Sequence, residues 1–207
     1  KDLDLIPDDI GDKATFDFSG DPCSDQKSWS RKGLVMGNVQ SGKTQNYIGL
    51  INKAFDSGYR VVILFGGHMN ELRNQTQLRV DNDVIGLESK HLIELNQTKK
   101  RGVGLIDSSI RVATLTSTEG DFNAKTAKTL RISLTDLSTP LIITMKKNTS
   151  VLGTLIKYIK ETSMLEDGQK IDVPMLLIDD EADWGSINSQ KMRDKISKTN
   201  EKIRELL

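Results

Sequence analysis

Residues 34–44 read LVMGNVQSGKT, a short apolar run followed by the pattern G-x-x-x-x-G-K-T. An apolar run that leads directly into this pattern predicts a β-strand, a phosphate-binding loop and a helix. The glycines let the backbone curl so that successive N–H groups point inward, and the positive end of the helix adds to this anion-binding nest. The stretch therefore predicts an α/β fold with a nucleoside triphosphate site.

The contacts to ATP are expected from this loop and from the first residues of the helix. Lys43 would reach the β- and γ-phosphate oxygens, in a binding and a catalytic role. The Thr44 hydroxyl would be one ligand of a Mg²⁺ ion that otherwise keeps water and phosphate oxygens around it. The predicted nucleotide-binding residues are Gly37, Asn38, Val39, Gln40, Ser41, Gly42, Lys43 and Thr44.

A second apolar run, MLLI at residues 175–178, follows Pro174 and ends in DDEAD at 179–183. A continuous apolar run of this length predicts a buried parallel strand, here of the Walker B type. An aspartate after such a strand can hold Mg²⁺, and an adjacent glutamate can orient and deprotonate the attacking water. We assign Asp180 to the metal and Glu181 to the water. Asp179 stays open as the alternative metal ligand, because it also adjoins the strand.

Composition limits the classes of partner and site. Hydrophobic residues make up 36% of the 207 residues, which is enough for a core, and 29 basic residues balance 29 acidic ones. Binding to a nucleic acid or a membrane surface would therefore depend on local patches of charge. The single cysteine and two histidines argue against a disulfide framework or a zinc-type cluster. With no apolar stretch near 18 residues, we expect a cytoplasmic protein without a membrane segment.

Apolar runs alternate with helical patterns along the chain, which predicts a parallel sheet with crossover helices. Helices are expected after the loop and up to Gly58, around residues 152–159, and from 187 to 207. We expect residues 1–30 to form an acidic N-terminal extension and 31–207 to form one RecA-like ATPase lobe. The predicted strands are residues 34–36, 61–65, 110–115, 141–144 and 175–178.

Loops that leave the carboxyl ends of parallel strands lie at one edge of the sheet, where ligands bind. This rule brings residues 66–70, 116–119 and 145–148 to the same edge as the two motifs. Small and basic residues there, and on the helix after residue 70, are candidate contacts to a nucleic-acid backbone. The alternative is that the basic side chains only solvate helix ends. The candidate contacts are Gly67, His68, Arg73, Arg79, Lys146 and Lys147.

Several strings of this sequence resemble the Z-one domain family over roughly residues 31 to 190. The strings are GNVQSGKTQN at 37–46, GYR at 58–60, NELRNQTQLR at 70–79 after Gly67, KKN at 146–148 with Leu152, and LIDDEAD at 177–183. Members of the family are similar to superfamily-two helicases and are often labelled endonucleases, because they are encoded with restriction-like or defence modules. The resemblance implies a DNA-dependent ATPase, with Gln40 and Arg73 lining the nucleotide or coupling surface.

Helicase-like ATPases bind ATP between two RecA-like lobes, and the second lobe normally supplies an arginine finger. We expect this chain to be a piece of a longer protein that lacks the second lobe, so that it binds MgATP weakly and hydrolyses it slowly by itself. A fused or partner nuclease is also implied. The alternative function is a nucleotide-gated interaction module that does not move along DNA. A small-molecule P-loop kinase is a third reading, disfavoured by the DEAD sequence.

Overall fold

The computed structural model describes residues 33–36, 42–91, 99–130, 132, 134, 137–162, 173–183, 186 and 197–206. Within this part of the chain, four strands form one all-parallel sheet in the order β2-β3-β1-β4. Val61 of the central strand lies opposite both Leu141 and Met175. The expected α/β class is confirmed, and the sheet is compatible with a RecA-like fold. The strands are β1 (Val61–Gly66), β2 (Ala113–Thr114), β3 (Leu141–Met145) and β4 (Met175–Asp180).

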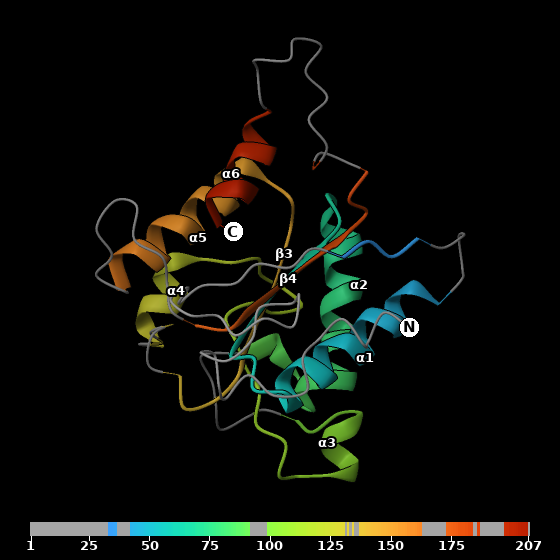
Figure 1. The fold of residues 1–207 in the computed structure, drawn as a ribbon. Helices are drawn as coiled ribbons and strands as arrows, with labels where there is room; N and C mark the ends of the chain where they lie inside the picture. Colours follow the sequence, from blue (N-terminus) through green and yellow to red (C-terminus); the bar gives the residue numbers. More distant parts are fainter. Residues whose placement is uncertain are drawn as a thin grey trace, which may run out of the picture.

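Helices cover both faces of this sheet (Figure 1). One face carries α1 (Lys43–Asp56) and α2 (Asn70–Val80), and the other carries α4 (Ala124–Thr129), α5 (Thr149–Thr162) and α6 (Lys198–Leu206). A π-helical turn, η2 (Asp81–Ile85), continues α2. The 3₁₀ turn η3 (Ser89–His91) and the short α3 (Val103–Ile106) follow it along the chain.

The core divides into two layers because side chains alternate across a strand. Val62, Leu64 and Ile142 pack with Ile48 and Ile51 of α1. The odd-numbered residues of β1 pack on the opposite face with α5, for example Ile63 with Leu152 and Leu155. β1 and β3 are buried along their whole length, as their continuous apolar sequences predict. The prediction of a buried strand at 175–178 is wrong, because β4 is only half-buried at the edge of the described sheet.

Two predicted strands differ from the structure. Residues 34–36 pair with no strand in the described part of the chain, and Leu34 and Met36 are 74% and 84% exposed. Of residues 110–115, only Ala113 and Thr114 form ladder pairs. An apolar run predicts burial, but a strand also needs a neighbouring backbone to bond. Residues 1–30 and 187–196, which include the expected extension and the start of the expected last helix, lie outside the described residues.

A buried polar network joins α2 to the loops beyond the sheet. Asp81 accepts hydrogen bonds from Gln77 Nε2 (2.9 Å) and from the backbone N–H (2.9 Å) and hydroxyl (2.7 Å) of Ser89. Thr116 donates to Gln77 Oε1 at 2.9 Å and accepts from the Thr144 N–H at 2.9 Å. The network therefore fixes α2 against the end of β2 and the carboxyl end of β3.

Burial raises the pKa of Asp81 above its ordinary value of 3.8, although the donors from Gln77 and Ser89 oppose that shift. The folded chain thus holds this proton more tightly than the unfolded chain, and the resulting stability is present at low pH and lost as the pH rises through the raised pKa. Asp81→Asn cannot titrate. The free energy of unfolding of the unchanged chain, relative to this variant, should therefore fall as the pH rises from about 4 towards neutrality.

Urea unfolding at a series of pH values measures this difference. Asp107 provides a control of opposite sign, because hydrogen bonds from Ser109 lower the pKa of this exposed carboxyl. The stability that Asp107 contributes should be present at neutral pH and lost as the pH falls. A difference between the chain and Asp81→Asn that is constant with pH would contradict the assignment of a buried, titrating Asp81.

Candidate functional site

The last residues of the glycine-rich motif lie at the N-terminus of α1 and are described by the structure. Gly42 precedes the helix with φ of +79°, in the left-handed region that glycine adopts without strain, and its carbonyl accepts the N–H of Asn46 at 3.1 Å. Lys43 and Thr44 are the first two residues of the helix. The predicted nucleotide contacts at residues 37–41 lie outside the described residues.

The two aspartates at the end of β4 face opposite sides of the sheet, as the two-residue period of a strand requires. Asp180 shares its face with Leu176 and Ile178, which pack in the layer beneath α1. Asp179 lies on the other face, where its Oδ1 is 2.8 Å from Nζ of Lys147 and its Oδ2 accepts from the Ser186 hydroxyl. Of the two candidate metal ligands, the structure thus brings only Asp180 towards the N-terminus of α1.

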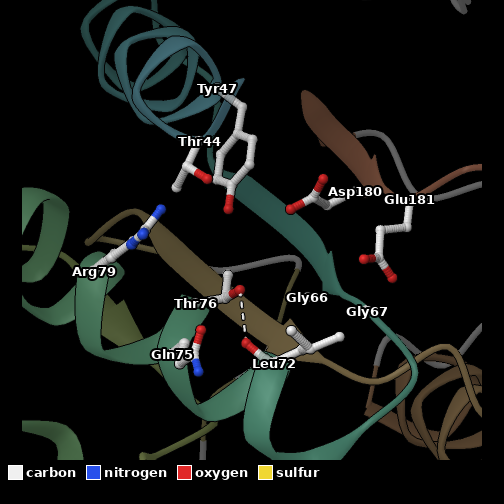
Figure 2. A pocket seen from close by; sticks show the side chains of 10 residues that line it. All are labelled: Thr44, Tyr47, Gly66, Gly67, Leu72, Gln75, Thr76, Arg79, Asp180 and Glu181. Carbon is white, nitrogen blue, oxygen red and sulfur yellow. Dashed lines mark hydrogen bonds between the residues drawn. The ribbon is translucent and has the colours of Figure 1, made fainter. Parts of the chain in front are cut away.

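A cavity of about 180 Å³ lies between α1, α2 and the carboxyl ends of β1 and β4. Figure 2 shows the Arg79 guanidinium and the Asp180 carboxylate directed towards the Tyr47 hydroxyl from opposite sides, with Glu181 beyond Asp180. The site thus places hydroxyl groups, two carboxylates and one cation around a small space. The lining residues are Thr44, Tyr47, Gly66, Gly67, Leu72, Gln75, Thr76, Arg79, Asp180 and Glu181.

Tyr47 lines the cavity, although neither of the two sequence motifs singled it out. Burial raises the pKa of its phenol, and the negative charge of Asp180 raises it further, against hydrogen bonds to Thr44 and Thr76 and the charge of Arg79. The phenol therefore stays neutral and can donate or accept a hydrogen bond in the cavity. Its spacing in the sequence could have indicated this position, because a residue three positions after Thr44 lies on the same face of the helix.

Glu181 occupies an unusual backbone position. Its φ is +60°, in the left-handed region that residues other than glycine rarely adopt. Its Oε2 is 3.7 Å from Nδ1 of His68, an ion pair only when the imidazole is protonated, and its side chain is 44% exposed. Gly67 has a φ of +83°, in the left-handed region that glycine adopts without strain, and an added Cβ would lie 3.2 Å from the Leu72 side chain and in van der Waals contact, at 3.4 Å, with this carboxylate oxygen.

The predicted phosphate contact by Arg73 is wrong for this structure. Arg73 is 2% exposed, and its guanidinium donates to the carbonyls of Ser117 (2.7 Å), Gly120 (3.1 Å), Thr144 (3.4 Å) and Thr118 (3.4 Å). A fifth contact goes to the side-chain oxygen of the neighbouring residue 74. Burial accordingly lowers the pKa of Arg73. The guanidinium thus joins α2 to the loop at residues 117–120 and to β3, and it is not available to bind a phosphate.

The other predicted basic contacts separate into two groups. Lys147 needs the same correction, because its side chain is 1% exposed and its ammonium lies against Asp179. Lys146 is 23% exposed with Nζ 3.9 Å from Oδ2 of Asp121, and Arg79 is exposed on the cavity wall. Gly67 and His68 adjoin Glu181. Of the six candidates, the structure therefore leaves His68, Arg79 and Lys146 at least partly exposed to an outside ligand, whereas Gly67 is buried and lines the cavity.

Comparison of the chain with protein-family models, with curated proteins and with solved structures finds no match. Among the described residues, no three or more His, Cys, Asp or Glu side chains form a group that could hold a metal ion. No helix in the described ranges is long and apolar enough to cross a membrane.

Proposed function

We propose that this chain is a RecA-like lobe that binds MgATP and hydrolyses ATP. The observation that supports the proposal is the convergence of Thr44, Asp180 and Glu181 on one cavity beside the N-terminus of α1. Thr44 belongs to one segment, and Asp180 and Glu181 belong to another that lies more than a hundred residues away in sequence. The motifs that contain these residues predict that the two segments come together. Lys43, at the start of the same helix, is the proposed phosphate-binding cation.

The residues of the cavity fit a magnesium ion. Mg²⁺ prefers oxygen ligands and usually keeps several waters and substrate phosphates, so that it needs only one or two protein ligands. The Thr44 hydroxyl and the Asp180 carboxylate are ligands of this kind. When bound, the ion neutralises negative charge on the phosphates. In this proposal Asp180 and Thr44 hold the metal, and Glu181 orients the attacking water and accepts its proton.

Asp180→Asn and Asp179→Asn form a matched pair that tests the metal assignment. Asp180→Asn should weaken the effect of Mg²⁺ on ATP binding. The loss of metal affinity should be at least the roughly 10- to 100-fold that is typical of removing an outer-shell partner. Asp179→Asn should keep that dependence and instead lower the free energy of unfolding by roughly 1–3 kcal/mol, because Lys147 loses its counter-charge but keeps an oxygen acceptor. Titration of a fluorescent ATP analogue with and without Mg²⁺, and urea unfolding, measure the two effects.

If both variants bind the nucleotide equally well with Mg²⁺, the cavity is not the metal site. If Asp179→Asn is the variant that loses the magnesium effect, Asp179 takes the role proposed for Asp180. If the unchanged chain does not bind ATP, the proposed function itself fails.

We further propose, on the sequence resemblance, that the ATPase depends on DNA and belongs to a restriction-like or defence system. The alternative is a nucleotide-gated interaction module without DNA translocation. The inward placement of Arg73 and Lys147 favours that alternative, because it removes two of the four basic side chains expected to contact a nucleic-acid backbone. Both functions use the same ATP site.

ATP hydrolysis with and without DNA, at several salt concentrations, separates the two functions. A DNA-dependent ATPase should be stimulated by DNA, with a stimulation that falls as salt rises and is reduced in Lys146→Gln. Lys157→Gln changes an exposed lysine of α5 and serves as the control. Hydrolysis that is indifferent to DNA under all these conditions would support the interaction module.

A further inference from the structure

Lys147 joins the carboxyl ends of three strands. Its backbone N–H donates to the carbonyl of Gly67 after β1 at 3.2 Å. Its ammonium lies 2.8 Å from Oδ1 of Asp179 at the end of β4, an ion pair whose angle is not that of a hydrogen bond, and it donates to the backbone carbonyl of Glu181. With its side chain 1% exposed, Lys147 has no room to serve an outside ligand.

The carbonyl that Lys147 binds belongs to the residue with the unusual backbone. A non-glycine residue at φ of +60° is held there only when its surroundings specify that conformation. The contact from Lys147 to the Glu181 carbonyl is an interaction of this kind, because a charged donor binds more strongly than a neutral one. The direction of the Glu181 side chain depends on this backbone conformation.

We propose that Lys147 is a positioning residue, which holds the turn at Glu181 so that the carboxylate is directed to the attacking water. The inference rests on the proposed ATPase function, in which Glu181 is the base. Lys147 itself contacts neither the nucleotide nor the water. Misplacing a reacting group by about 1 Å can cost on the order of 10²-fold in rate, so loss of this contact should appear in kcat and not in ATP binding.

The test compares two variants that both lack the ion pair. Asp179→Asn keeps the Lys147 ammonium on the Glu181 carbonyl, whereas Lys147→Met/Asp179→Asn removes the ammonium without leaving a buried carboxylate unpaired. Relative to Asp179→Asn, the double variant should lose about 10- to 100-fold in kcat with little change in KM. Restoring a cation, in Lys147→Arg, should recover part of the loss.

A second measurement needs no nucleotide. The amides of residues 180–183 should exchange hydrogen faster in the double variant than in Asp179→Asn, because the turn is no longer held. In a background of Glu181→Gln, replacing Lys147 should cause no further loss of kcat, since the group that it positions is already inactive.

The outcomes decide separately on the two proposals. Equal kcat in Asp179→Asn and in the double variant overturns the role of Lys147, as does unchanged hydrogen exchange at residues 180–183. If the unchanged chain neither binds nor hydrolyses MgATP, the proposed function fails, and the exchange measurement still decides whether Lys147 holds the turn.

Discussion

Glu181→Gln is expected to lower kcat for ATP hydrolysis by about 10²- to 10⁴-fold, the usual contribution of general base catalysis, while MgATP binding is retained. The amide has the shape of the carboxylate and can still hydrogen-bond to a water, but it cannot accept the proton. Glu181 lies on the wall of the cavity beside Asp180, with its side chain 44% exposed, so water has access to it. Phosphate release under saturating ATP measures the loss, and titration of a fluorescent ATP analogue measures the binding.

Asp183→Asn is the matched control for this prediction. Asp183 belongs to the same DEAD sequence and is exposed, but it is not among the residues that line the cavity. Its replacement should leave both kcat and binding close to those of the unchanged chain. A Glu181→Gln variant that still turns over normally, or that loses binding together with rate, would take the role of base away from Glu181.

Arg73→Leu is expected to lower the free energy of unfolding by more than about 4 kcal/mol, within the range of exceptional single substitutions. The leucine would leave the buried carbonyls of Ser117 and Thr144 without their donor, and each buried acceptor left unpaired costs roughly 1–3 kcal/mol. The donor to the Gly120 carbonyl is lost as well. Urea unfolding measures the effect.

Arg79→Leu changes the same residue type on the same helix, α2, and should have the opposite pattern of effects. Arg79 is exposed and lines the cavity, so its loss should change stability by less than about 0.5 kcal/mol. ATP hydrolysis should fall, because one cation facing the cavity is removed. A stable Arg73→Leu variant, or an unstable Arg79→Leu variant, would contradict the burial that separates the two arginines.

Much of the fold could be predicted because three of its described strands begin as continuous apolar runs. The predicted strands at 61–65, 141–144 and 175–178 begin at the residues where β1, β3 and β4 begin. The prediction fails at residues 34–36, which form no strand in the described part of the chain. It also fails over most of residues 110–115, of which only Ala113 and Thr114 form a strand. Apolarity is a property of the segment itself, but strand pairing depends on which backbone lies beside it.

The candidate site also has features that local sequence determines and features that depend on tertiary contacts. The sequence alone determined the left-handed glycine before α1, the hydroxyl and cation at the start of that helix, and the acidic residues at the end of an apolar strand, because each depends on its immediate neighbours. The tertiary structure alone decided which aspartate faces the cavity, and which of two adjacent lysines and of two arginines on one helix is buried. Arg73 is held by carbonyls 44 to 71 residues away in sequence. Whether a charged side chain turns inward depends on acceptors that only folding brings to it, so no local pattern of residues could have separated Arg73 from Arg79 or Lys147 from Lys146.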